Sequence, residues 1–86
     1  MVIIKAKQPL STKISVKDFK SRFSGSEMRA INQKSEVDDE VYRYNMLVDS
    51  VSNVDLADLD TISGVQYLVS IGILTEERSK EILKIY

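Results

Sequence analysis

The amino-acid sequence predicts an all-α protein, a compact bundle of four or five short helices with an extended N-terminal arm. Three observations predict this fold. Apolar residues recur at spacings of three and four in several segments, as they do along one face of a helix. Ser, Thr or Asp stands directly before most of these segments, where helix N-caps are expected. The chain has 86 residues, which is the size of one domain with a small core.

The N-terminal arm, residues 1–13, precedes the helical domain, residues 14–86. Its apolar block Val2–Ile4 is too short to form a helix face, and Pro9 prevents a helix from continuing. Because an isolated strand is not stable, two interpretations stay open. The block either lies along the helical body or adds as a strand to a sheet edge of another chain. The arm is part of a basic region, since residues 1–23 carry six bases and one acid.

Two capping signals open the first two predicted helices. Ser15 is followed three residues later by Asp18, an acidic variant of the capping box. Ser24 and Glu27 match the capping-box spacing in full. The apolar residues behind the first cap are Val16, Phe19 and Phe23, which share one helix face. The second helix is expected to carry Met28 and Ile31.

The third helix is predicted from about Asp38 to Val51. A stripe of apolar residues at alternating spacings of four and three indicates the face that it turns to the core. The stripe consists of Val37, Val41, Tyr44, Val48 and Val51, with Leu47 beside it.

Tyr42 and Met46 lie on the other side of this helix, one turn apart. They stand about 140° or more from the centre of the stripe, on the side expected to face solvent. Two interpretations stay open. They are either scattered surface residues, which are normal, or a contact with a partner, because Tyr and Met are enriched in protein interfaces.

Three aspartates, Asp55, Asp58 and Asp60, precede the next helix. Their spacing does not match a calcium-binding loop, which also needs a glycine at the turn and a glutamate at the twelfth position. We expect these aspartates to cap the following helix and to stabilise its positive end.

The segment from Thr61 to Leu83 predicts a helical hairpin around which the domain is organised. Its first half is apolar around most of the circumference, so this central helix must be covered from more than one side. Gly72 is expected to end it in the left-handed conformation, which glycine adopts without steric cost. Thr75 then caps a last helix with acids first and bases later, as the helix dipole favours. The buried face of that helix is expected to consist of Ile82, Leu83 and Tyr86.

The composition argues against catalysis and against a metal or cofactor site. The chain has no cysteine and no histidine, so it lacks thiolate ligands and the commonest general base. It also lacks phosphate-binding loops and nucleophile motifs. We therefore expect no enzyme activity, no cofactor and no metal. No apolar run approaches the roughly 20 residues that span a membrane, and the N-terminus lacks the order of a signal peptide, so we expect a cytoplasmic protein without membrane contact.

Two segments resemble a known group of proteins. They are VKDFKSRFSGSEMRAI and VDLADLDTISGVQYLVSIGILTEERSKEIL. Together they are similar to small proteins encoded by tailed bacteriophages, in which a first segment of the type F..RFT..E..AI is followed by VDL.D....GV..L...G.LT.ER..EIL. The matching positions of the second segment are Val54, Asp55, Leu56, Asp58, Gly64, Val65, Leu68, Gly72, Leu74, Thr75, Glu77, Arg78, Glu81, Ile82 and Leu83.

The resemblance covers roughly residues 14–84 and leaves out the arm. It implies a product of the virion-structure or tail gene region, without an assigned activity, and it carries over no catalytic or ligand-binding residue. The linker 56–60 lacks the proline that these phage proteins often have before the central helix, so the resemblance does not predict the local turn.

Three functions compete on this basis. The first is a phage virion protein of the tail or head–tail region, found in the host cytoplasm before assembly, which contacts other phage structural proteins or copies of itself. Its predicted contact residues are Val2, Ile3, Ile4, Tyr42 and Met46. The second is an inhibitor or adaptor that binds a host protein through the acidic region 36–60.

The third function is a nucleic-acid-binding regulator. A recognition helix presents its N-terminal residues to the groove of the nucleic acid. Here those residues are Thr75, Glu76 and Glu77, and the two glutamates would face phosphates. Proteins that bind nucleic acid usually carry an excess of positive charge, whereas the net charge of this chain is −1. We therefore rank nucleic-acid binding last.

Overall fold

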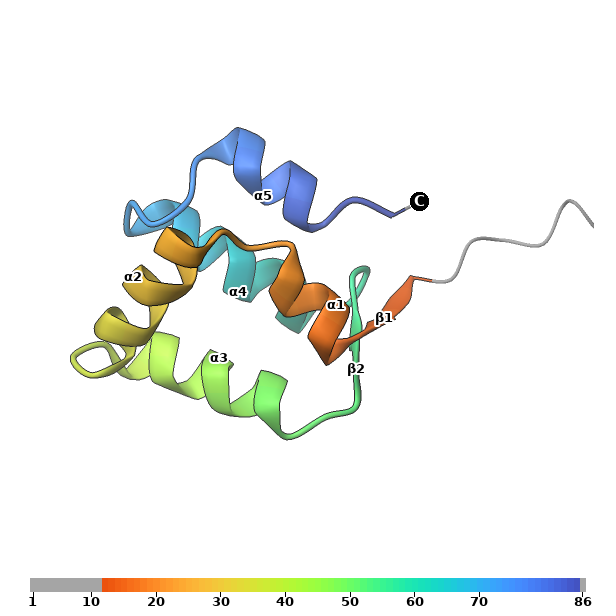
Figure 1. Cartoon of the computed structure of the whole chain (residues 1–86), viewed down its shortest axis with the longest axis horizontal. Coiled ribbons are helices and arrows are strands. Elements are labelled where there is room, and N and C mark those ends of the chain that lie inside the picture. Colours follow the sequence, from red (N-terminus) through yellow and green to blue (C-terminus); the bar gives the residue numbers. More distant parts are fainter. Residues whose placement is uncertain (1–11, 86) are drawn as a thin grey trace, which may run out of the picture.

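The computed structural model describes residues 12–85. The elements in chain order are β1 (Lys13–Ser15), α1 (Val16–Ser21), α2 (Gly25–Ser35), α3 (Asp39–Asp49), β2 (Asn53–Asp55), α4 (Leu59–Ser70) and α5 (Glu76–Ile82) (Figure 1). The protein is therefore mostly helical, as the sequence predicted. The prediction of a purely α-helical fold was wrong, because β1 and β2 form a small sheet.

The two strands are antiparallel, and Lys13 pairs with Asp55, Ile14 with Val54 and Ser15 with Asn53. Backbone hydrogen bonds extend the pairing at both ends. The N–H of Leu56 donates to the carbonyl of Thr12 at 2.8 Å, and the N–H of Val16 donates to that of Ser52 at 3.2 Å. Lys13, the last residue assigned to the arm, thus belongs to the sheet. Strands of three residues are too short to show the alternation by which a strand is recognised in a sequence.

The predicted N-caps of α1, α2 and α5 are confirmed. The Ser15 hydroxyl accepts from the N–H of Asp18 at 3.0 Å, and the Thr75 hydroxyl accepts from that of Arg78 at 3.1 Å. At α2 the capping box is complete, because the N–H of Ser24 also donates to Glu27 at 2.7 Å. These helices begin where the sequence places their caps because each cap satisfies donors within its own first turn.

The core draws on all five helices and on β2. Its buried residues are Phe19, Ile31, Val41, Val54, Leu56, Val65, Leu68, Leu74 and Ile82. The helix α4 packs against both α3 and α5, which confirms its central position (Figure 1). Gly64 lets α3 approach closely, because a Cβ at this position would lie 3.1 Å from the Tyr44 ring.

Gly72 ends α4 with a φ of +86°, as predicted. The N–H groups of Ile73 and Leu74 both donate to the carbonyl of Leu68, at 2.9 and 3.2 Å. This turn reverses the chain and places α5 alongside α4.

Part of the core stripe predicted for α3 was wrong. Val41 is buried, and Val48 packs against the core. Val37 is 80% exposed, Val51 is 49% exposed and Leu47 is 44% exposed. Val37 and Val51 lie outside α3, which spans Asp39–Asp49, so the helical period does not place them. Leu47 lies on α3 itself, on a flank that remains open to solvent.

Candidate protein-binding surface

The α3 contact face, which we define as Tyr42 and Met46, lies on the solvent side of the helix. Tyr42 is 56% exposed and Met46 is 53% exposed, so the predicted exposure of both residues is confirmed. Because they stand four residues apart, their side chains are neighbours on successive turns. The other predicted contact residues, Val2, Ile3 and Ile4, lie outside the described residues.

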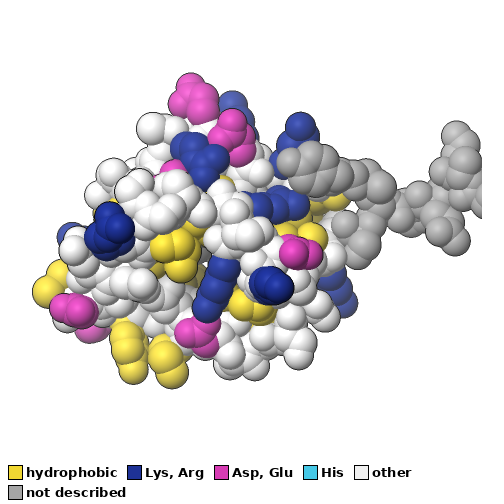
Figure 2. All heavy atoms as spheres, viewed as in Figure 1, with side chains coloured by type: hydrophobic (Ala, Val, Ile, Leu, Met, Phe, Trp, Pro, Cys, Tyr) yellow, Lys and Arg dark blue, Asp and Glu magenta, His cyan; other side chains and the backbone are white. Residues whose placement is uncertain are grey.

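Exposed apolar side chains gather around α3. The large exposed hydrophobic residues of the described chain are Val37, Tyr42, Met46, Leu47, Val51, Leu59 and Ile85. Five of these seven fall between residues 37 and 51, so the distribution is uneven. Figure 2 shows apolar side chains protruding along the edge that α3 forms in Figure 1.

Side chains from other elements fix α3 at both ends. At its start, the Asp38 carboxylate accepts from the N–H groups of Glu40 and Val41, and the Tyr67 hydroxyl donates to it at 2.7 Å. The hydrogen bond from Tyr67 is the main reason why the pKa of Asp38 lies below its ordinary value. At its end, Asp49 forms an ion pair with Lys20 of α1 at 2.6 Å. The contact face therefore stands on a helix held at two points.

An acidic groove lies on the opposite flank of α3, between this helix and the turn from β2 into α4. Its volume is about 240 Å³. Its apolar floor contains Leu47, Val48, Val51 and Val54, and its acidic rim contains Asp55, Asp58 and Asp60. Leu47 stands about 140° around the helix from Tyr42, given about 100° per residue. The groove and the α3 contact face are therefore separate surfaces.

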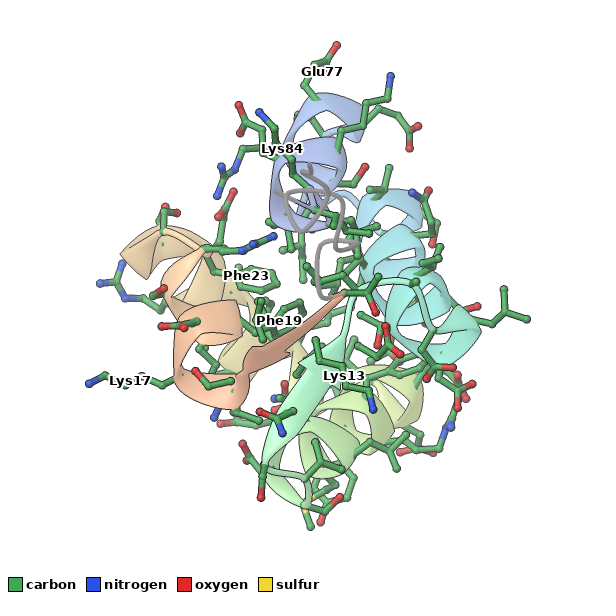
Figure 3. All side chains as sticks on the ribbon, turned by 90° about the vertical axis from the view of Figure 1, so that its right-hand side faces the viewer. Lys13, Lys17, Phe19, Phe23, Glu77 and Lys84 are labelled. Atoms are coloured by element: carbon green, nitrogen blue, oxygen red, sulfur yellow. The ribbon has the colours of Figure 1, made fainter. Side chains whose placement is uncertain are left out.

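The three rim aspartates differ in their surroundings. Hydrogen bonds from the Thr12 side chain and from the backbone N–H of Ala57 hold the pKa of Asp55 below its ordinary value. Lys13 lies opposite Asp55 and projects from the sheet end of the molecule (Figure 3). Asp58 occupies the N-cap position of α4, but its side chain accepts no N–H of that helix, so the predicted cap is absent. Asp60 lies in the first turn, where a carboxylate stabilises the helix dipole as predicted.

A second, smaller hollow of about 90 Å³ lies between α1, α2, α3 and α4. Its walls are core residues such as Phe19, Phe23 and Val41, and Lys20, Asn45 and Asp60 stand among its lining. Pockets that enclose a small-molecule ligand usually have volumes of about 300 Å³ or more. This hollow is therefore better explained as imperfect packing of the core than as a ligand site.

The strongest polar cluster of the described chain joins α5 to the start of α2. The Arg78 guanidinium donates to both carboxylate oxygens of Glu27, at 2.8 and 2.7 Å, and to Glu81 at 2.7 Å. It also donates to the backbone carbonyl of Arg22 at 2.8 Å, and Arg22 in turn donates to the carbonyl of Ile82 at 2.6 Å. Sequence reasoning found Glu27 as a cap but missed this bidentate pair, because Arg78 is 51 residues away.

The Arg78 guanidinium lowers the pKa of Glu27 from 4.5 to about 2, chiefly through the hydrogen bonds between them. In the folded protein, the Glu27 carboxylate is therefore mostly ionised at every pH above about 2. The cluster fastens α5 to the start of α2, and its residues line neither the acidic groove nor the smaller hollow. The described residues hold no group of His, Cys, Asp or Glu suited to a metal ion.

Glu27 should make the protein less stable in acid. Its pKa is lower in the folded state than the ordinary 4.5, so the unfolded chain takes up the proton first. The stability that the ion pair contributes is therefore complete above about pH 4.5 and is lost as the pH falls towards about 2. We expect a loss of about 2 kcal/mol, less than the pKa difference alone implies, because Arg78 is partly exposed to water. Urea unfolding at several pH values measures it.

The control for this pH dependence is Glu27→Gln, which cannot titrate at this position. Its free energy of unfolding should fall less between about pH 5 and about pH 2 than that of the wild-type protein. The other carboxylates titrate in both proteins, so the difference between the two curves isolates Glu27. Parallel curves would contradict the assignment of the lowered pKa to this residue.

Comparison with models of protein families, with curated proteins and with solved structures gave no match. None of the helices that the structure describes is long and apolar enough to cross a membrane.

Proposed function

We propose that this protein is a non-enzymatic component of a bacteriophage particle, placed in the tail or at the head–tail junction, and that it acts by binding other proteins. One observation carries the protein-binding role: the exposed apolar side chains gather on and beside α3. The assignment to a phage rests on the resemblance of residues 14–84 to small phage-encoded proteins. Before assembly the protein would reside in the host cytoplasm.

The α3 contact face has the chemistry of an interface centre. Tyr and Met supply large apolar area with few strongly hydrated groups, and both are enriched in protein interfaces. Because α3 is held at both ends by Tyr67 and Lys20, the face loses little further freedom when a partner binds. Val2, Ile3 and Ile4 remain predicted contact residues of the arm.

Quantitative mass spectrometry of purified phage particles tests this proposal. We expect the protein to be present in particles, and the double variant Tyr42→Ala with Met46→Ala to be incorporated at least about tenfold less, since a loss of about 1.4 kcal/mol of binding free energy has this effect. Both residues are more than half exposed, so their truncation should leave the fold intact. Circular dichroism of the purified variant checks this.

Gln66→Ala is the matched control, because Gln66 is an exposed residue of α4 outside the contact face. Its incorporation should equal that of the wild-type protein. Absence of the protein from particles, while it is present in infected cells, would overturn the proposal. In that case a single stoichiometric host partner of the wild-type protein, lost in the double variant, would favour the host-adaptor function.

A further inference from the structure

We propose that the acidic groove binds the N-terminal segment of the same chain, Val2–Lys7. This inference leaves Tyr42 and Met46 free for a partner, because it concerns the flank of α3 that lies opposite the contact face. It replaces the predicted role of Val2, Ile3 and Ile4 as contacts with another protein, since the same segment would occupy the groove of its own chain. Three features carry it: the chemistry of the groove, the chemistry of the segment and the place where the arm leaves the sheet.

The groove combines an apolar floor with a rim whose charged residues are all negative. Leu47 is 44% exposed and Val51 is 49% exposed, so the floor is open to an occupant. The rim contributes three aspartates, and the residues that line the groove include no lysine or arginine. Within the described chain, the side chains of Asp58 and Asp60 form no hydrogen bond or ion pair with another residue. Lys13 lies opposite Asp55, whereas Asp58 and Asp60 have no such neighbour among the residues that the structure describes, so a segment with apolar and positively charged side chains complements the groove.

The segment Val2–Lys7 has this composition. Its sequence is VIIKAK, so a block of three β-branched residues is followed by two lysines, and the first acid of the chain is Asp18. The apolar block matches the floor, and Lys5 and Lys7 match the carboxylates of the rim. Ion pairs between these lysines and the rim aspartates would remain largely hydrated. Such pairs determine the orientation of a bound segment more than they increase its affinity. Burial of the apolar side chains supplies the favourable free energy.

The arm leaves the sheet beside the rim. The carbonyl of Thr12 accepts from Leu56 at 2.8 Å, and Lys13 pairs with Asp55, which is itself a rim residue. Thr12 follows Ile3 by nine positions, and an extended chain covers at most about 3.3–3.6 Å per residue, so Ile3 can reach about 30 Å from this point. Attachment this close to the groove gives the segment a high effective concentration there, which favours binding within one chain over binding between copies.

Disulfide trapping tests the proposal, because the chain has no cysteine of its own. The full chain is prepared as Ile3→Cys with Leu47→Cys, and as Ile3→Cys with Met46→Cys. Met46 is the matched control: it is adjacent in sequence to Leu47, it is 53% rather than 44% exposed, and it points about 100° away around the helix. Each protein is oxidised mildly at low concentration. Mass spectrometry and a non-reducing gel then separate links within a chain from links between chains.

We expect the Leu47 variant to form a link within one chain at least about tenfold faster than the Met46 variant, which corresponds to a preference of about 1.4 kcal/mol. Adding Asp58→Asn and Asp60→Asn should reduce this ratio. Adding Glu76→Gln and Glu77→Gln, which removes two exposed carboxylates of α5, should leave it unchanged. Equal rates for Leu47 and Met46 would overturn the proposal. Links that form only between chains would also overturn it and would make a second copy the occupant.

Discussion

Replacing Arg78 by alanine should lower the free energy of unfolding by about 2–3 kcal/mol. The substitution removes both hydrogen bonds to Glu27, the bond to the Arg22 carbonyl and the pair with Glu81. The side chain of Glu27 is only 14% exposed. Without Arg78, its carboxylate would have no cation beside it, and water could hydrate it only in part. We place the loss below the range for fully buried pairs because the Arg78 side chain is 33% exposed. Urea unfolding followed by circular dichroism measures it.

Two further variants show whether geometry or charge is responsible. Arg78→Lys keeps the charge but loses the planar fork that matches a carboxylate, so about half of the stability loss should remain. Arg43→Ala removes the same side chain from an exposed pair with Glu40, at 3.1 Å and with both side chains about half exposed. This variant should lose clearly less stability than Arg78→Ala, even with its contact to the Tyr44 ring included, because water screens an exposed pair. Equal losses for Arg78→Ala and Arg43→Ala would contradict a special role of the Glu27 pair.

Replacing Ile82 by alanine should lower the free energy of unfolding by about 3 kcal/mol. Ile82 is 0% exposed and is the most completely buried large side chain of the core. The substitution removes three carbon atoms from the face of α5 that packs against the core. It leaves a cavity, and the side chains around this cavity lose their van der Waals contacts with Ile82. Thermal or urea unfolding measures the change.

The matched control is Ile85→Ala, the same substitution three residues later at a position that is 39% exposed. It should cost less than about 1 kcal/mol, because water already reaches this side chain. A domain of this size has a total stability of only about 4–12 kcal/mol. Ile82→Val, expected to lose about 1 kcal/mol, therefore keeps the test possible if the alanine variant does not fold. A greater loss at Ile85 than at Ile82 would contradict the assigned core.

The helices could be predicted because their signals are local. Ser15, Ser24 and Thr75 satisfy donors within three residues of themselves, and Gly72 needs only its own φ of +86°. The sheet could not be predicted, because each strand has three residues and places one apolar side chain, Ile14 or Val54, in the pairing. Its existence depends on two segments that lie far apart in the sequence.

The surfaces could be predicted only in part. The exposure of Tyr42 and Met46 follows from their angle to the core stripe, because the period of a helix fixes the direction of each side chain. The acidic groove does not follow in this way. Leu47 would be a core residue if another element covered its side of α3. The sequence of α3 does not show whether such an element is present. The Glu27–Arg78 pair escaped prediction for the same reason, since its partners come from opposite halves of the chain.

The place of α5 has a consequence for synthesis on the ribosome. Arg78 contacts Glu27 and Arg22 across 51 and 56 residues, and Arg22 contacts the carbonyls of Ile82 and Lys84 across 60 and 62 residues. Each of these bonds joins the region of α1 and the start of α2 to α5 or to the residues that directly follow α5. A nascent chain that still has α5 in the exit tunnel therefore cannot close its core, however well α1 and α2 have formed. The native packing of α1 and α2 has to wait until α5 has left the tunnel.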